Sequence, residues 1–340
     1  MTRADLSGAT VGGHFRLSNR LGSGHFGDVY LCDHTLLGHR SALKVIPVKA
    51  SDTDALALEA KLLNLSTHPH IVKVRSAGYW TAAGSRDYFL IEMEYVPGGS
   101  LQDAIAREIS IGELLPLMKN VLFALDHAHP DVIHRDVKPA NILLGGGGKL
   151  SDFGIAMVSA TGASASKLHY NLNLAPECLS PTKTFNVATD IFAAGLALLR
   201  SLNLIADWRA TLNSVPSVRA KMAQGALLKE LRFHPRVPPA LVRVVRRACA
   251  SDPAKRYATA SDFRDALEAL KVERDWRRAG ADLWESEGGA EQLVIAATKS
   301  GYAADYLRKR RRKSAFHKDG LSREAAERYV YEVIAATTLR

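Results

Sequence analysis

One short segment, residues 132–144, constrains the chain more than any other part of the sequence. It sets five polar residues between apolar, strand-like pieces: His134, Arg135, Asp136, Lys138 and Asn141. A short interval separates Asn141 from the triplet Asp152-Phe153-Gly154. Carboxylate and amide oxygens at Asp152 and Asn141 match Mg²⁺, which binds through few protein oxygens together with phosphates. The segment therefore predicts a loop built for chemistry beside a metal-bound phosphate.

Two further residues of this loop fit the transfer of a phosphoryl group. Asp136 stands in a short loop, where a carboxylate is suited to accept the proton of an attacking hydroxyl. Lys138 carries a positive charge that would neutralise the charge developing on the transferred group. We therefore expect Asp136 and Lys138 to be catalytic residues.

A glycine-rich stretch near the N-terminus suits phosphate binding. The run Gly22-Ser23-Gly24-His25-Phe26-Gly27-Asp28-Val29 lies between two predicted strands. Glycines let a backbone approach phosphate oxygens closely and adopt turns that a Cβ forbids. A dinucleotide-binding fold requires a helix to open at such a motif, whereas here a strand follows. A plain hairpin turn remains the alternative interpretation of this stretch.

A lysine on an apolar strand follows in Ala42-Leu43-Lys44-Val45. Such a lysine either extends its charged end to solvent or has a fixed anionic partner. Glu59, on the next predicted helix, is the candidate partner, and a Lys44–Glu59 pair would hold the ammonium against nucleotide phosphates. The alternative for Glu59 is a solvated helix face.

The order of predicted elements indicates an α+β chain with two lobes. Strands are expected over residues 14–21, 28–32, 41–48, 71–79 and 88–95, with one helix over 55–65. The turn Pro97-Gly98-Gly99 is a natural hinge. Helices are expected beyond it, over 114–129, 187–202, 239–250 and 260–270, with a loop at 145–148 between two short strands. Ligands usually bind in a cleft between such lobes.

With these motifs in order, the chain resembles the eukaryotic-type protein kinase family, over roughly Phe15 to Leu270. The later motifs are Ala175-Pro176-Glu177, the run from Asp190 to Gly195, and the run from Asp252 to Tyr257. The resemblance implies a two-lobed fold, with a β-rich N-lobe over 14–96 and a helical C-lobe over 97–270. It also implies that residues 132–144 form the catalytic loop, that the Asp190 helix supports this loop, and that Arg256 pairs with Glu177.

The resemblance implies the site residues as well, with ATP as phosphate donor and Mg²⁺ as metal. Catalysis is assigned to Asp136, Lys138, Lys44 and Glu59, and metal binding to Asn141 and Asp152. Nucleotide binding is assigned to Leu21, Gly22, Ser23, Gly24, Gly27, Val29, Ala42, Lys44, Met93, Glu94 and Val96. Lys138 is similar to the Ser/Thr-specific branch of the family, and the Val237–Leu241 stretch followed by Asp252-Pro253 resembles its bacterial members.

The segment before Ala175 departs from the family pattern. Where the family has a Gly-Thr pair and a Tyr, this chain holds His169, Tyr170 and Asn173. Either the substrate pocket is divergent but working, or the acceptor is altered, or the segment is closed and needs a partner. Hydroxyls just upstream are candidate phosphorylation sites, with a mobile linker as the alternative: Ser159, Thr161, Ser164 and Ser166. Arg135 is placed to pair with a phosphate there.

Composition narrows the setting of the protein. The formal net charge is +10, which suits phosphate-rich partners or anionic surfaces. Cys32, Cys178 and Cys249 are far apart and form neither a disulfide framework nor a metal cluster, which favours a cytoplasmic protein. Residues 1–13 form a polar tail without a signal-peptide pattern. The most apolar stretch, 191–206, is too short for a membrane span and predicts a buried helix.

Residues 271–340 lie outside the resemblance and are expected to form a small helical appendage. Helices are expected over 272–285, which carries Trp276 and Trp284, and over 293–313. Ser322 is the expected cap of a last amphipathic helix. The two tryptophans either dock on the adjacent lobe or recruit a partner. The basic run 308–313 either binds an acidic partner or polyanion, or is a solvated helix end.

Three functions remain open on the sequence. The first is an ATP-dependent protein kinase that phosphorylates Ser or Thr hydroxyls, with autophosphorylation. The second is a catalytically weak scaffold with the same fold, which the unusual segment before Ala175 leaves possible. The third is a small-molecule kinase, against which Lys138, Glu177 and the Asp190 helix argue. The protein substrate and the oligomeric state are not specified by these patterns.

Overall fold

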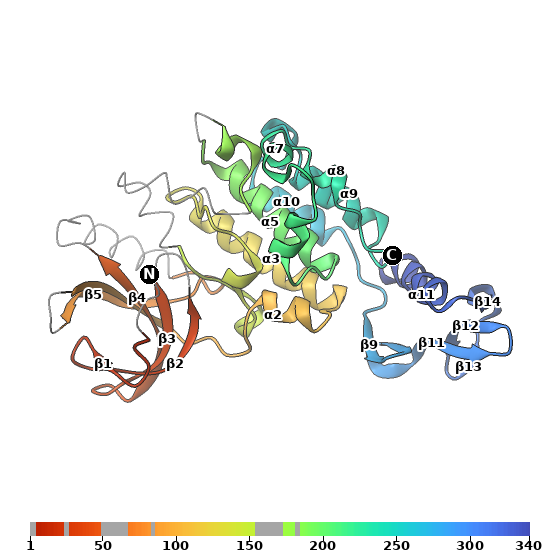
Figure 1. Cartoon of the computed structure of the whole chain (residues 1–340), viewed down its shortest axis with the longest axis horizontal. Helices are drawn as coiled ribbons and strands as arrows, with labels where there is room; N and C mark the ends of the chain where they lie inside the picture. Colours follow the sequence, from red (N-terminus) through yellow and green to blue (C-terminus); the bar gives the residue numbers. More distant parts are fainter. Residues whose placement is uncertain (1–4, 24–26, 49–66, 83–85, 154–172, 181–183) are drawn as a thin grey trace.

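The computed structural model describes residues 5–23, 27–48, 67–82, 86–153, 173–180 and 184–340. A strand-rich lobe, a helical lobe and a C-terminal unit follow one another along the long axis of the molecule (Figure 1). The two-lobed kinase-like architecture expected from the sequence is confirmed. The predicted helix over 55–65 lies outside the described residues.

The first lobe is a six-stranded antiparallel sheet in the order β1-β2-β3-β4-β6-β5. Its strands are β1 (Thr10–Val11), β2 (Phe15–Ser23), β3 (Asp28–His34), β4 (His39–Val48), β5 (Val74–Ala82) and β6 (Arg86–Glu94). Alternate residues of β3 are buried, because successive side chains of a strand point to opposite faces. The sheet starts earlier than residue 14, since Val11 is fully buried and pairs with Phe15.

Two long helices form the centre of the second lobe. α3 (Ile111–Ala128) is capped by the Ser110 side chain, and α5 (Val187–Leu202) is capped by Asn186. Every residue of α5 from Thr189 to Leu202 is buried, as expected for a helix that is apolar all round. This confirms the prediction of a buried helix here. The other helices are α2 (Leu101–Ala106), α6 (Trp208–Asn213), α7 (Val218–Ala223), α8 (Leu227–Glu230), α9 (Pro239–Ala248) and α10 (Ala260–Glu268).

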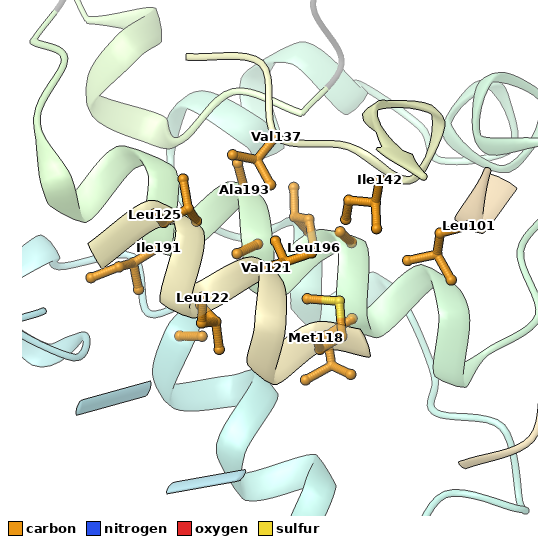
Figure 2. Packing of buried hydrophobic residues seen from close by; sticks show 14 of the residues in the cluster. Leu101, Met118, Val121, Leu122, Leu125, Val137, Ile142, Ile191, Ala193 and Leu196 are labelled. Atoms are coloured by element: carbon orange, nitrogen blue, oxygen red, sulfur yellow. The ribbon is translucent and has the colours of Figure 1, made fainter. Parts of the chain in front are cut away.

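The candidate site packs on the contact between α3 and α5. Figure 2 shows side chains of α3 and α5 packed together, with apolar residues of the segment 132–144 packed against them. The labelled members are Leu101 of α2, Met118, Val121, Leu122 and Leu125 of α3, Ile191, Ala193 and Leu196 of α5, and Val137 and Ile142 of the segment 132–144. The short hairpin of β7 (Ile142–Leu143) and β8 (Lys149–Leu150) joins the loop to residue 152.

The C-terminal appendage is a sheet covered by one helix, so two of its three predicted helices are wrong. Its strands are β9 (Trp276–Gly280), β10 (Leu283–Ser286), β11 (Glu291–Thr298), β12 (Gly301–Arg308), β13 (Arg311–Arg312) and β14 (Lys318–Leu321). The first two largely occupy the expected helix over 272–285, and the next three the expected helix over 293–313. Leu293 and Ile295 are buried in alternation, which is the period of a strand. Gly301 breaks the expected helix, because its φ is +136° and a Cβ would meet the Leu321 carbonyl. The last helix, α11 (Arg323–Thr338), is confirmed with its Ser322 cap.

The two tryptophans belong to the core of the appendage. Trp276 packs edge-on against Tyr306, and Trp284 packs edge-on against Tyr331 of α11. Both tryptophans also line a small cavity together with Ile111 and Arg236 of the helical lobe, so they lie where the appendage meets that lobe. A polar contact at the same junction comes from Asp275, which is 6% exposed. Its carboxylate accepts hydrogen bonds from the Ser110 hydroxyl (2.8 Å) and the Gly112 N–H (2.7 Å), both at the start of α3. A Cβ at Gly112 would collide with this carboxylate, so the helix start is shaped to receive it.

Among the described residues, no helix has the length and apolar character needed to cross a membrane.

The Asp275→Ala variant should have a lower melting temperature than the wild type. It leaves the Gly112 N–H and the Ser110 hydroxyl without their buried acceptor, at a cost of about 1–3 kcal/mol. Differential scanning calorimetry measures the change. The matched control is Asp282→Ala, which removes an exposed aspartate of the same appendage that pairs with Arg323. An unchanged melting temperature in Asp275→Ala would show that the appendage does not depend on this contact.

Candidate active site

The catalytic loop is held from below by one buried carboxylate. Asp190, in the first turn of α5, is fully buried and accepts hydrogen bonds from the His134 N–H (2.7 Å) and the Arg135 N–H (2.8 Å). The Nε2 atom of His129 lies 3.2 Å from the same carboxylate. Arg135 has a φ of +65°, a left-handed conformation that costs free energy for a residue with a Cβ. The two hydrogen bonds stabilise that conformation and so fix the loop.

The structure brings Asp136, Lys138 and Asn141 together. Asp136 is 3% exposed, and its Oδ2 accepts from the Lys138 ammonium (2.6 Å) and from the Asn141 amide (3.0 Å). The Asn141 amide also donates to the Asp136 carbonyl (2.8 Å). Since the Lys138 side chain is about a third exposed, its charge can reach a ligand above the loop. The three polar groups thus form one connected cluster.

Asp152 is tied to this cluster through its neighbour Ser151. The N–H and hydroxyl of Ser151 both donate to the Asn141 carbonyl, at 2.9 Å and 3.0 Å. The Nε2 atom of His134 lies 3.0 Å from the Ser151 carbonyl, and the His134 ring packs edge-on against Phe153. Asp152 itself has a φ of +71°, a second left-handed residue in the site. Strain of this kind persists where the surroundings over-determine it.

Lys44 forms an ion pair with Asp152, a contact between the two lobes that the sequence did not suggest. Lys44 is 6% exposed on β4. Burial alone would raise the pKa of Asp152, but the charge and hydrogen bond of Lys44 outweigh it and leave that pKa below its usual value. The two residues are 108 positions apart, so no local pattern could reveal the pair.

Several expected site residues lie outside the described residues: Gly24, Glu59, Ser159, Thr161, Ser164, Ser166, His169 and Tyr170. The Lys44–Glu59 pair is therefore untested.

The remaining residues assigned to nucleotide binding lie on neighbouring strands and at the hinge. Val29 pairs with Lys44 across β3 and β4, and Ala42 pairs with Met93 across β4 and β6. The chain then runs through Glu94 and the buried Val96 into α2. Leu21, Gly22 and Ser23 end β2, where all three are exposed. Packing also requires a glycine at position 27, because a Cβ on Gly27 would clash with the Val45 carbonyl of β4.

The donor set fits a magnesium ion that also binds phosphate. Asp152 supplies carboxylate oxygens and Asn141 an amide oxygen, both hard ligands. Among the described residues, no group of three or more His, Cys, Asp or Glu side chains could hold a metal by itself. A site with two protein residues fits Mg²⁺, which keeps waters and takes phosphate oxygens to complete its shell.

A second ion pair joins two segments of the helical lobe. Arg256 donates from its two terminal nitrogens to the two oxygens of Glu177, at 2.6 Å and 2.9 Å. This confirms the predicted pair. Asn173 and Leu174, just before it, are buried.

A family model described as "Protein kinase domain" matches residues 15–269. The chain belongs to the protein kinase family. The kinase PknJ of Mycobacterium tuberculosis, named a serine/threonine-protein kinase, is 33% identical over 78% of this chain and 46% of that protein. The similarly named PrkC of Bacillus subtilis is 29% identical over 79% of this chain and 42% of that protein. This chain thus spans less than half the length of these relatives.

Solved kinase structures agree with the fold. The kinase domain of PknI from Mycobacterium tuberculosis superposes with a TM-score of 0.54 and 28% identity, covering 79% of this chain and 99% of that one. The family match ends at residue 269, before β9 begins. The appendage is therefore outside the matched kinase domain.

Replacing Lys44 should change how stability depends on pH. Because the folded-state pKa of Asp152 is depressed, its ionised form stabilises the fold above pH ~4, and that contribution is lost as the pH falls through the folded value. In Lys44→Met, the main opposition to the effect of burial is lost and only the weaker effects of Lys138 and His134 remain, so the pKa of Asp152 rises. The gap in melting temperature between wild type and Lys44→Met should therefore narrow from pH 7 to pH 4.

Thermal denaturation of both proteins across this pH range is the measurement. Lys229→Met removes an exposed lysine of α8 and serves as the matched control. A gap that stays constant or widens toward pH 4 would contradict the role of Lys44 in holding Asp152 ionised.

Proposed function

We propose that the chain is an ATP-dependent kinase that transfers the γ-phosphoryl group to Ser or Thr hydroxyls of proteins, including its own. The observation that carries this proposal is the connected cluster of Asp136, Lys138 and Asn141, joined through Ser151 to Asp152. Such a cluster combines a proton acceptor, a cation and two oxygen ligands around one point. Phosphoryl transfer requires this combination, because catalysis there is mostly positioning and charge stabilisation.

In the proposed reaction, the substrate hydroxyl oxygen bonds to the γ-phosphorus while the bond to the bridging oxygen of ADP breaks. Asp136 accepts the hydroxyl proton and orients the attacking oxygen. Lys138 stabilises charge on the transferred group, and Lys44 holds the phosphates of the nucleotide. Asn141 and Asp152 would hold Mg²⁺, which supplies positive charge to the phosphates when bound.

The strands and hinge provide the proposed nucleotide site. Ala42, Met93 and Val96 are apolar residues close to the end of the sheet, which suits an adenine ring. The Gly22–Ser23 end of β2 and Gly27 would bring backbone N–H groups to the phosphates. The four hydroxyl residues between Ser159 and Ser166 remain our candidates for autophosphorylation, with Arg135 as the cation that would order a phosphate.

A scaffold with weak activity and a small-molecule kinase are the competing functions. Against the scaffold, all the charged and amide groups needed for transfer are in the chain. Of the described ones, Lys44, Asp136 and Asn141 are buried, and Asp136 is hydrogen-bonded to Lys138 and Asn141. Against the small-molecule kinase, Arg256 fixes Glu177 next to the segment that would receive a peptide. The cysteines are free and buried, in keeping with a proposed cytoplasmic setting.

The Asp136→Asn variant should lose phosphoryl transfer while keeping its fold. An amide keeps the shape of the side chain but accepts a proton poorly, so kcat should fall by roughly 10²-fold or more. The measurement is transfer of labelled phosphate from ATP to a basic protein and to the chain itself. Asp131→Asn, an exposed aspartate near the same loop, is the control. Equal rates in wild type and Asp136→Asn would remove Asp136 from the proposed mechanism.

The basic run forms an exposed hairpin tip between β12 and β13, and we propose that this tip binds a polyanion or acidic partner. Lys309 and Arg310 both have positive φ in the turn. Arg308 pairs with Glu291 and Arg312 with Asp305, whereas the other basic residues of the run have no carboxylate within 4 Å among the described residues. Those residues are Lys309, Arg310, Arg311 and Lys313.

The probe for this surface is a 20-base-pair duplex DNA, with polyglutamate as a second anion. Affinity should fall steeply with salt, because neutralised charges release counterions. The triple change Lys309→Gln, Arg310→Gln and Arg311→Gln should reduce the slope of the logarithm of affinity against the logarithm of salt concentration by about three. The same change at the exposed Arg209, Arg219 and Arg243 is the control. Salt-insensitive binding, or equal slopes in both triple variants, would exclude the tip as the contact.

A further inference from the structure

The last turn of α5 contains a buried arginine that lacks an acidic partner. Arg200 is 5% exposed. Its two terminal nitrogens donate to the Gln102 side-chain oxygen (2.5 Å) and, more weakly, to that of Asn173 (3.4 Å), and both acceptors are neutral. The guanidinium stacks on the Trp208 ring at 5.4 Å, while its Nε is buried without a hydrogen-bond partner among the described residues. Burial lowers the pKa of Arg200 to about 10.

Other buried arginines of the same lobe have complete sets of partners. Arg236 donates to three backbone carbonyls, those of Ile109, Ser201 and Leu202. Arg256 forms its two-pronged pair with Glu177. Both have structural roles that explain their burial. Arg200 differs because its charge is desolvated with neither an anion nor a full set of acceptors, and such a group is costly to bury.

The chain itself does not supply the missing anion from the segments near Arg200. Among the described residues, no carboxylate lies within 4 Å of its guanidinium, whose hydrogen-bond acceptors are the neutral oxygens of Gln102 and Asn173. The ranges 154–172 and 181–183, which flank Asn173 and are not described, contain neither Asp nor Glu in their sequence. Within the part of the chain that the structure describes, no carboxylate neutralises Arg200, which leaves this charge available to a carboxylate of another molecule.

The position of Arg200 suits a contact with a peptide substrate. Asp190, which holds the catalytic loop, lies ten residues earlier on the same helix, so the two Cα atoms are about 15 Å apart. Gln102 is in the first turn after the hinge, and Asn173 directly precedes Leu174 and Ala175. Asp190 binds the N–H group of Arg135, the residue before Asp136, so this distance sets the scale from the proposed proton acceptor to Arg200. An extended peptide rises about 3.3 Å per residue and covers it in about five residues.

We infer that Arg200 is a specificity-determining residue that binds the carboxylate of an Asp or Glu in the peptide substrate, within about five residues of the phosphorylated hydroxyl. This inference rests on the proposed function. On binding, the substrate carboxylate replaces the neutral Gln102 and Asn173 oxygens at the guanidinium and forms a charge-assisted pair. The pair lies where water is excluded, so it discriminates strongly between an acidic and a neutral side chain.

The test uses peptides with one Ser, in which a single Glu is moved from five residues before it to five residues after it. Each is compared with the peptide that has Gln at the same position. In the wild type, Glu at one position should raise kcat/KM at least about tenfold over Gln, through KM, because hydrogen bonds to charged groups contribute about 1.5–3 kcal/mol. Arg200→Gln should bring this ratio close to one, and Arg200→Lys should retain part of it.

The control is Arg209→Gln, which removes an equal charge from an exposed position on α6 and should keep the full ratio. If Arg200→Gln does not fold, the charge-reversed variant Arg200→Glu provides the second readout: it should prefer Lys over Gln at the same peptide position. A ratio near one at every position in the wild type would overturn the inference. So would a preference for Glu that survives in Arg200→Gln.

Binding of fluorescent versions of the peptides, measured by anisotropy, separates this inference from the proposed function, because it needs no phosphoryl transfer. A Glu preference in binding that Arg200→Gln abolishes supports the inference even if no phosphate is transferred, an outcome that would contradict the proposed function alone. Equal binding of Glu and Gln peptides by a protein that phosphorylates both would contradict the inference alone.

Discussion

The carboxylate of Asp190 is the interaction on which the rest of the site depends. It is fully buried at the start of a helix that is itself buried, and it binds two consecutive N–H groups of the catalytic loop. These two hydrogen bonds hold Arg135 in a left-handed conformation that would otherwise cost free energy. The position of Asp136 therefore follows from the packing of α5 against α3.

Four buried charges, three in the helical lobe and one in the appendage, show how the partners of a charged residue decide its role. Asp190 is satisfied by backbone N–H groups and is structural, as is Arg256 with Glu177. Asp275 serves the same purpose between the appendage and α3, so the appendage is anchored by a specific polar contact. Arg200 has no such complement, and for that reason it is the charge for which we infer an external partner.

The sequence predicted that Asp136, Lys138 and Asn141 lie together, because all three stand within residues 132–144 and their contacts are local. The strands of the first lobe and the helices α3, α5, α9 and α10 also agreed with their periodicity. The Lys44–Asp152 pair was missed because it joins the two lobes. The appendage was misassigned because short apolar runs fit both helix and strand periods, and because Gly301, inside the helix expected over 293–313, has a positive φ that a helix does not accommodate.

The most direct test of this account is amide hydrogen exchange of the catalytic loop in wild type and Asp190→Asn, followed by mass spectrometry. The account predicts that the peptide containing His134 and Arg135 exchanges at least about tenfold faster in the variant, because the charged acceptor of both N–H groups is gone. A peptide from the centre of α3 should keep its protection. Equal exchange of the loop peptide in the two proteins would contradict the claim that Asp190 holds the catalytic loop.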